Sequence, residues 1–307
     1  MPYKLYSNRN AIPKIAVLAV VVLLLSQLAV PAIGKLSGPY LGQIPPSSTP
    51  RLFASGIVSV YANFEHSAAA FSPDGSELYW CTNVDARTNP PGAGQELYGM
   101  RQINGVWTAP EVASFTAEIS GTVQRPVFSS DGMRLYFDVF GEPPRNDDSD
   151  IYVVERIGDG WSKPVSMSSA INTSAIERLH CVASDGSLIF SRSPFTGREK
   201  MYMSRLVDGE FAEPEELGAP FDSAAHELAV VLSPDASYLL INLTRTGKED
   251  ELYICYKQPD DSWTDRIRAP YKCGGFLALS PDGLYLFFLG EGIYWVDTSF
   301  VERLRPS

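Results

Sequence analysis

Four short segments of the sequence contain side chains that can bind a ligand or transfer a proton. Each segment lies six to nine residues before an aspartate that recurs along the chain, at positions 74, 131, 185 and 235. Because the segments share this position in a repeat, we expect them to converge at the mouth of a central channel. Their charged and imidazole side chains are those of Glu65, His66, Arg125, Glu177, Arg178, His226 and Glu227.

Carboxylates and imidazoles at one site support two kinds of chemistry. They can hold a divalent metal ion, or they can serve as acid and base in the cleavage of a glycan. None of the four segments has the local ligand spacing of a metal motif, so the sequence identifies neither a metal set nor a catalytic residue. Arginines of the loops on the same face, Arg192, Arg198 and Arg245, could meet an anion, but solvated surface charge is the simpler interpretation.

A structural role competes with a functional one for part of this set. The three glutamates recur at almost the same offset, which favours a task in the repeat itself, such as capping a neighbouring loop. His66, Arg125, Arg178 and His226 differ from unit to unit and are the better candidates for ligand contact. His180 lies further into its strand and is expected to be a core or channel histidine.

Five copies of one β-hairpin position these segments. Each copy has an apolar residue, a Ser-Pro-Asp-Gly turn or a variant of it, and a returning apolar run such as Leu78-Tyr-Trp80. Pro presets φ in such a turn, Asp bonds nearby backbone N–H groups, and Gly accepts the left-handed conformation. The shared residues are Asp74, Asp131, Asp185, Asp235 and Asp282, at steps of 57, 54, 50 and 47 residues. A period of about 50 residues in an all-β pattern favours propeller blades over a sandwich.

A second hairpin follows each of the first four turns. A tyrosine in a short strand, such as Tyr98, is followed nine or ten residues later by an aromatic residue, such as Trp107, with turn residues such as Asn104-Gly105 between them. Each unit therefore has four strands, the fourth beginning at the Trp. The sequence predicts an all-β fold, a five-bladed β-propeller of four-stranded antiparallel blades.

The fifth unit lacks a fourth strand, since no turn and no second Trp follow Tyr294-Trp295-Val296. The segment 50–58 resembles the residues that precede the second and third units. We expect this N-terminal strand to complete the last blade, which would leave no unpaired edge at the seam. Six blades are the alternative if residues 35–65 build more structure.

The recurring apolar-Ser-Pro-Asp-Gly-x-x-Leu-Tyr-Phe element, with Asp-Ile-Tyr and Gly-x-Trp-x-x-Pro after it, resembles the WD40-like repeat of the TolB type, also called PD40. The resemblance covers about residues 66–296; the third copy lacks the Pro, and the fourth has Ala236 in place of Gly. It implies a propeller in the bacterial cell envelope. It does not imply one activity, because such propellers serve as binding platforms, as partners of envelope proteins and as domains of peptidases.

The N-terminal 34 residues read as a signal peptide or a membrane anchor. Three basic residues and no acid precede an apolar run from Ile15 to Leu25, and the stretch 15–33 carries no charge. The pattern favours a cleaved export signal ending near Gly34, with an uncleaved hydrophobic helix outside the domain as the alternative. Residues 35–50 are expected to form a Pro-rich linker, and 51–307 the propeller. The protein is then exported and is periplasmic, extracellular or anchored, with membrane contact only through the N-terminal segment.

The net charge of −11 argues against a nucleic-acid partner, because phosphate binding needs a basic surface. The four cysteines fit no zinc motif. Buried thiols are expected for Cys81 and Cys181, whereas an oxidising compartment leaves a Cys255–Cys273 disulfide open.

The sequence contains no Gly-x-Ser-x-Gly, no His-Glu-x-x-His and no Gly-rich phosphate loop. It favours a non-catalytic binding platform whose channel face holds an envelope protein, a glycan or a small ligand, without a cofactor. The alternative is a glycan-active hydrolase or lyase that uses the Glu and His cluster, with or without a divalent metal. An inert scaffold, with a channel filled by side chains, is a third hypothesis.

Overall fold

The computed structural model describes residues 36–60, 67–83, 95–143, 148–194, 198–221, 227–244 and 250–306. For residues 83, 227, 228 and 244 it describes the backbone alone. The predicted signal peptide or anchor, with its apolar stretch 15–33, lies outside the described residues. Within the described ranges, no helix has the length and apolar character needed to span a bilayer.

The described residues fold into antiparallel sheets built on one plan, in which three neighbouring strands follow each other along the chain and a short strand closes the outer edge. The first path is β2 (Ala70–Phe71), β3 (Glu77–Asn83), β4 (Gln95–Ile103) and β6 (Glu111–Val112). The second is β7 (Thr122–Phe128), β8 (Arg134–Phe140), β9 (Ser149–Ile157) and β11 (Val165–Ser166). The third is β12 (Ile176–Val182), β13 (Leu188–Ser193), β14 (Lys200–Ser204) and β17 (Glu215–Glu216).

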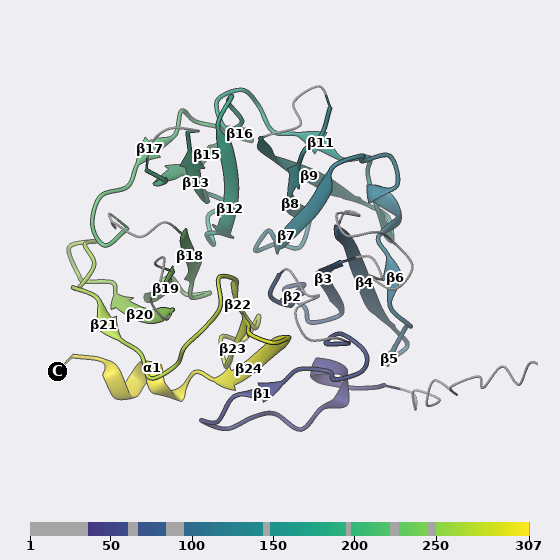
Figure 1. The fold of residues 1–307 in the computed structure, drawn as a ribbon, viewed down its shortest axis with the longest axis horizontal. Helices are drawn as coiled ribbons and strands as arrows, with labels where there is room; N and C mark the ends of the chain where they lie inside the picture. Colours follow the sequence, from purple (N-terminus) through teal and green to yellow (C-terminus); the bar gives the residue numbers. More distant parts are fainter. Residues whose placement is uncertain are drawn as a thin grey trace, which may run out of the picture. The chain divides into compact units, whose positions relative to one another are not determined.

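The fourth path is β18 (Glu227–Leu232), β19 (Tyr238–Thr244), β20 (Glu251–Tyr256) and β21 (Ile267–Arg268). The last is β22 (Leu277–Leu279), β23 (Tyr285–Leu289), β24 (Ile293–Asp297) and β1 (Arg51–Leu52). Figure 1 shows these sheets around a common centre, with the first strand of each path innermost: β2, β7, β12, β18 and β22. One parallel pairing, Ile176 with Ser149, connects the second and third paths.

Local turn chemistry explains the hairpin between the first two strands of each path. The Ser72 hydroxyl donates to Oδ1 of Asp74 at 2.6 Å, and the same carboxylate accepts the N–H of Ser76 at 3.0 Å. Gly75 follows with φ of 70°. The same pattern holds Asp131, where hydrogen bonds from the Ser129 hydroxyl and the Met133 N–H lower the pKa of the carboxyl. The predicted role of the turn aspartate is confirmed at these turns.

The outer strand differs from the prediction, which began it at the Trp. The residues at Trp107 and Trp161 form short pieces, β5 (Val106–Trp107) and β10 (Gly160–Trp161), that pair with the far end of the preceding long strand. The outer strands β6 and β11 begin after Pro110 and Pro164. Proline has no N–H to donate to a ladder, so it divides the outer strand in two. The third path has the same division: the short piece β16 (Glu210–Phe211) pairs with β15 (Leu206–Val207) and precedes the outer strand β17.

The N-terminal strand closes the last sheet. Arg51 pairs with Trp295 and Leu52 with Tyr294, both antiparallel, and Figure 1 shows β1 beside β24 at the seam. The closing strand expected within residues 50–58 is therefore present. It joins the two ends of the described chain in one sheet.

Residues 36–50, expected as a linker, are part of the folded unit. They contain the 3-10 turn η1 (Pro39–Gly42), whose Leu41 is 2% exposed. Leu36 accepts the backbone N–H of Trp107, and the Tyr40 hydroxyl donates to Asp282 at 2.8 Å. Apolar side chains within this Pro-rich stretch therefore pack on both sides of the seam.

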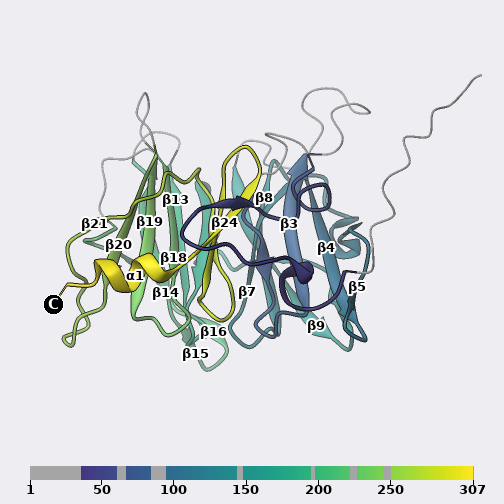
Figure 2. The same ribbon diagram turned by 90° about the horizontal axis from the view of Figure 1, so that it is seen from below.

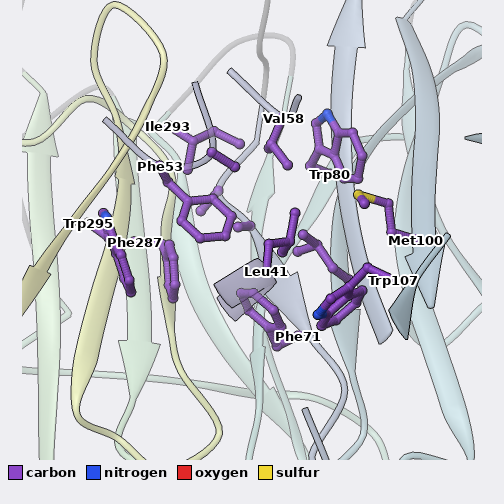
Figure 3. Packing of buried hydrophobic residues seen from close by; sticks show 14 residues of the cluster. Leu41, Phe53, Val58, Phe71, Trp80, Met100, Trp107, Phe287, Ile293 and Trp295 are labelled. Carbon is purple, nitrogen blue, oxygen red and sulfur yellow. The ribbon is translucent and has the colours of Figure 1, made fainter. Parts of the chain in front are cut away.

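Five apolar clusters form the core, and each contains residues from two consecutive sheets. Figure 3 shows the cluster at the seam, where Phe53, beside β1, lies near Phe71 and Trp295. Its ring centroid is 5.9 Å from that of Phe71 and 5.3 Å from that of Trp295. At the next interface the C-terminal helix α1 (Ser299–Leu304) packs Phe300 and Val301 against the fourth sheet, and Figure 2 shows it beside β20 and β21. A second 3-10 turn, η2 (Ser114–Thr116), follows β6.

Candidate functional site

A cavity of about 310 Å³ lies where the five innermost strands meet. It is lined by residues of β2, β7, β12, β18 and β22 and reaches the recurrent turns at Pro73, Pro234 and Pro281. Most of the lining is apolar. Among the described residues that line it, Arg125 is the charged side chain and His180 the imidazole.

Two β-bulges direct these residues toward the cavity. In β7 the register shifts between Gln124 and Val127, and Arg125 has a left-handed φ of 52°. In β12 the register shifts between Leu179 and Cys181, so His180 is the extra residue. A bulge bends its strand and re-aims a side chain, which is why bulges are frequent next to binding sites. Both bulges therefore position a polar side chain in a mostly apolar wall.

Arg125 contacts a carboxylate and an aromatic ring. Its Nε lies 3.4 Å from Oδ2 of Asp138, which stands on β8 of the same sheet. Its guanidinium carbon lies 4.5 Å from the ring centroid of Phe276, which precedes β22 in the last sheet. A cation within about 6 Å of a ring centroid is attracted to the ring face. Arg125 thus connects the second and last sheets across the interior.

Asp138 is a buried carboxyl group next to the cavity. Its residue is 2% exposed, and its Oδ1 accepts the backbone N–H of Leu179 at 3.0 Å. Burial raises the pKa of Asp138 to about 7, although Arg125, the Leu179 N–H and Arg178 oppose the shift. The charge of the Arg125–Asp138 pair therefore changes near neutral pH.

His180 is a buried neutral imidazole. The residue is 7% exposed, and burial lowers its pKa well below the usual value, an effect that the cations of Arg125 and Arg178 strengthen. Its Nε2 has no hydrogen-bond partner among the described residues. Buried polar atoms are normally satisfied, so this nitrogen is an exception within a residue that lines the cavity.

Glu177 and Arg178 precede the bulge but do not line the cavity. Glu177 is fully buried; it accepts a hydrogen bond from Arg192 Nε at 2.9 Å and one from the Thr173 hydroxyl at 2.6 Å. Arg192 also donates to the carbonyls of Ala170 and Ile171. Glu177 thus anchors the loop in front of β12, as the recurrence of the glutamates suggests. Arg178 lies 3.5 Å from Glu199 and is one-third exposed.

The remaining predicted residues divide as follows. Glu65, His66 and His226 lie outside the described residues, and for Glu227, the first residue of β18, only the backbone is described. Neither Asp138 nor Phe276 was predicted from the sequence as a site residue. A single carboxylate within the apolar run Leu135 to Phe140 was the signal that could have identified Asp138. Nothing local marks Phe276.

No group of three or more His, Cys, Asp and Glu side chains within the described ranges could hold a metal ion. The divalent-metal hypothesis depends on side chains outside those ranges and stays a prediction. All four cysteines are buried free thiols. Buried thiols were expected for Cys81 and Cys181, and the open Cys255–Cys273 disulfide is not formed.

Comparison with known proteins gives fold-level similarity only. No family model and no curated protein matches the chain. A putative TolB from Agrobacterium tumefaciens is similar in structure, with a TM-score of 0.50 and 17% identity over 74% of this chain and 74% of the other. TolB from Acinetobacter baumannii matches with a TM-score of 0.47 and 16% identity over 76% of this chain.

The chain spans 54% of the length of that second TolB. The Pseudomonas aeruginosa periplasmic gluconolactonase matches with a TM-score of 0.42 and 16% identity over 72% of this chain and 64% of the other. The ring of antiparallel sheets and the Agrobacterium match agree with the resemblance of the repeats. The described residues thus have a β-propeller fold similar to that of the putative Agrobacterium TolB.

Proposed function

We propose that the protein is an exported, non-catalytic binding platform with five blades, and that its ligand site is the central cavity. The five strand paths and the five apolar clusters between consecutive paths support the blade count. Export is supported by the basic and apolar N-terminal sequence and by the suitability of an acidic chain for the cell envelope. The ligand is a small molecule or a short segment of an envelope partner.

The observation that carries the proposal is the composition of the cavity wall. Ligand sites typically enclose about 300–1,000 Å³ and combine an apolar lining with a few convergent polar groups. The cavity of about 310 Å³, with Arg125 and His180 set into an apolar wall by two bulges, matches this description. An inert scaffold would instead have a channel filled by its own side chains.

A hydrolase or lyase would need two titratable groups at catalytic separation. Asp138 contacts Arg125, and Glu177 lies three residues before His180 on β12; each carboxylate is engaged by an arginine and by a backbone N–H. Neither lines the cavity. The glycan-active alternative therefore depends on Glu65, His66, His226 and Glu227, and it stays a prediction from the sequence.

The proposal is tested by filling the cavity. Ala278 lines it from β22 and is partly exposed, so Ala278→Phe should occupy the space without a change of charge. The full-length protein would be screened by thermal unfolding against small organic acids, amino acids, short peptides and cell-wall glycan fragments. A ligand that prefers the native state raises the midpoint of unfolding.

We expect at least one compound to stabilise the wild type and to have no effect on Ala278→Phe. The matched control is Ala117→Phe, at an exposed alanine after η2 that does not line the cavity. This control should respond as the wild type does. Stabilisation that persists in Ala278→Phe, or a panel without any effect on the wild type, would overturn the cavity as the binding site.

A further inference from the structure

We propose that the cavity recognises a carboxylate group on an apolar body, with the carboxylate at Arg125 and His180 and the apolar body against Phe276. The inference rests on the proposed function and names the chemical class of its ligand. It covers a free organic acid and the C-terminal carboxylate of a peptide, because the recognised group is the same.

The charge of the lining favours an anion. Arg125 is the charged side chain among the described lining residues, and no Asp or Glu belongs to that lining. The whole chain carries a formal charge of −11, whereas the charge that the described lining presents to the cavity is the cation of Arg125, with Asp138 behind it at 3.4 Å. Guanidinium–carboxylate contacts are among the stronger charge-assisted hydrogen bonds. A single guanidinium matches a monoanion better than a phosphate, which carries about −1.5 to −2 at neutral pH.

His180 supplies the second polar contact. Its Nε2 is buried, belongs to a cavity-lining residue and has no hydrogen-bond partner among the described residues. In the tautomer that carries its proton on Nε2, the neutral imidazole donates one hydrogen bond there. A carboxylate oxygen accepts such a bond, whereas an apolar occupant would leave the nitrogen buried and unsatisfied.

The backbone conformation of β7 fixes the position of the Arg125 guanidinium. A left-handed φ at a residue as large as Arg is uncommon and persists where the surroundings enforce it. In β7 the bulge, Pro126 and the contact with Phe276 fix the position of Arg125. A pre-positioned guanidinium loses less side-chain freedom on binding than an exposed arginine would.

The apolar part of the ligand has a matching surface. Aromatic and branched side chains line the cavity around the two polar groups: Phe71, Val127, Val182, Phe276, Leu277 and Leu279. The limited volume fits a short aliphatic or aromatic acid, or one C-terminal residue of a peptide.

Asp138 makes the site dependent on pH. Among the described residues, it is an anion that faces Arg125, at 3.4 Å; the cation of Arg178 on β12 also acts on Asp138, and both arginines act on His180. Ionised Asp138 repels a ligand carboxylate at Arg125, whereas protonated Asp138 carries no charge and does not repel it. We therefore expect tighter binding at pH 6 than at pH 8.

Isothermal titration of the full-length protein tests the proposal. The probes are hexanoate and phenylacetate, with hexanamide and phenylacetamide as neutral controls of nearly the same shape. We expect the acids to bind about 10- to 100-fold more tightly than the amides, the range of a hydrogen bond to a charged group. The Asp138→Asn variant should bind the acids more tightly than the wild type at pH 8 and lose the pH dependence.

A variant without the cation completes the experiment. Arg125→Gln alone would leave Asp138 buried without its cation and could unfold the protein, so Arg125→Gln/Asp138→Asn removes both charges together. It should bind acid and amide equally. Acid and amide of equal affinity in the wild type, with both lost in Ala278→Phe, would refute the carboxylate inference but leave the cavity proposal intact.

Failure of all four probes to bind the wild type would also refute the carboxylate inference, and the cavity would then be judged on the wider panel alone. Two further probes separate the sources of the carboxylate: a tripeptide ending in leucine and the same tripeptide as its C-terminal amide. Tighter binding of the peptide acid than of hexanoate would assign the site to a peptide terminus. The reverse order would assign it to a free acid.

Discussion

The guanidinium carbon of Arg125 lies 4.5 Å from the centroid of the Phe276 ring, although the two residues belong to sheets that are not consecutive around the ring. The contact crosses the interior from the second sheet to the last. It depends on a bulge in β7, because a regular strand would direct the side chain elsewhere. The cavity thus has one wall that neither sheet could form alone.

Phe276→Leu should remove this cation–π contact while keeping an apolar side chain. We expect a loss of about 0.5–2 kcal/mol in the free energy of unfolding, measured with urea. Phe276→Tyr retains the ring face and serves as the control. A double-mutant cycle with Arg125→Gln/Asp138→Asn should show coupling; additive effects would contradict the contact.

Asp138 should make stability depend on pH. Its pKa is about 7 in the folded protein and about 3.9 when unfolded. Because the pKa is raised in the folded protein, the contribution of Asp138 to the free energy of unfolding is complete below the unfolded pKa and is lost as pH rises through about 7. Thermal unfolding between pH 5 and pH 8 should therefore show a decline in wild-type stability that Asp138→Asn reduces. Parallel profiles for the two proteins would contradict the raised pKa.

The turn aspartates should act in the opposite direction. Hydrogen bonds from Ser129 and from the Met133 N–H lower the pKa of Asp131, and those from Ser233 and Ser237 lower the pKa of Asp235. Their contribution to the free energy of unfolding is present above the pKa of the unfolded chain and is lost as pH falls through the pKa of the folded protein. Unfolding followed from pH 5 to pH 2 should show acid destabilisation that is weaker in Asp131→Asn, and an unchanged slope would exclude this cause.

Glu177 should be essential to folding stability. Glu177→Gln would leave Arg192 without its buried anion, and removal of one partner of a buried pair costs about 3–5 kcal/mol. The control is Glu118→Gln, which breaks an exposed pair with Lys163 and should cost about 0–1 kcal/mol. Urea unfolding of the two variants and the wild type measures both changes in the free energy of unfolding. Equal small effects would mean that Glu177 does not anchor the loop before β12.

Ala236 occupies a turn position where four other copies have glycine, and its φ of 55° lies in the left-handed region. Ala236→Gly should stabilise the protein by about 0.5–1 kcal/mol, because the relief of left-handed strain exceeds the entropy that glycine adds to the unfolded chain. The reverse change, Gly75→Ala, should destabilise by a similar amount; its added Cβ meets nothing within 4 Å, so it isolates the conformational effect. Equal stability of Ala236→Gly and wild type, measured by calorimetry, would argue against strain at this turn.

Features that depend on neighbouring residues could be predicted from the sequence. The Ser–Asp hydrogen bonds and the left-handed exit of each turn are local, so the recurrent hairpins and the antiparallel sheets followed from them. The closing strand beside Trp295 could also be predicted, because the last unit lacked its fourth strand. The broken outer strand could have been foreseen from Pro110 and Pro164.

The assembly of the site, in contrast, depends on contacts between residues far apart in the sequence. Arg125 could be identified from its position in the repeat. Its contacts with Asp138 and Phe276 depend on a bulge and on two sheets that face each other across the interior, so residue spacing in the sequence does not predict them. Burial, also a tertiary property, gives Asp138 its raised pKa and leaves His180 Nε2 without a partner among the described residues. The packing of Leu41 into the seam likewise depends on sheets far along the chain. Local chemistry therefore specified the repeat, and contacts between distant residues specified the cavity.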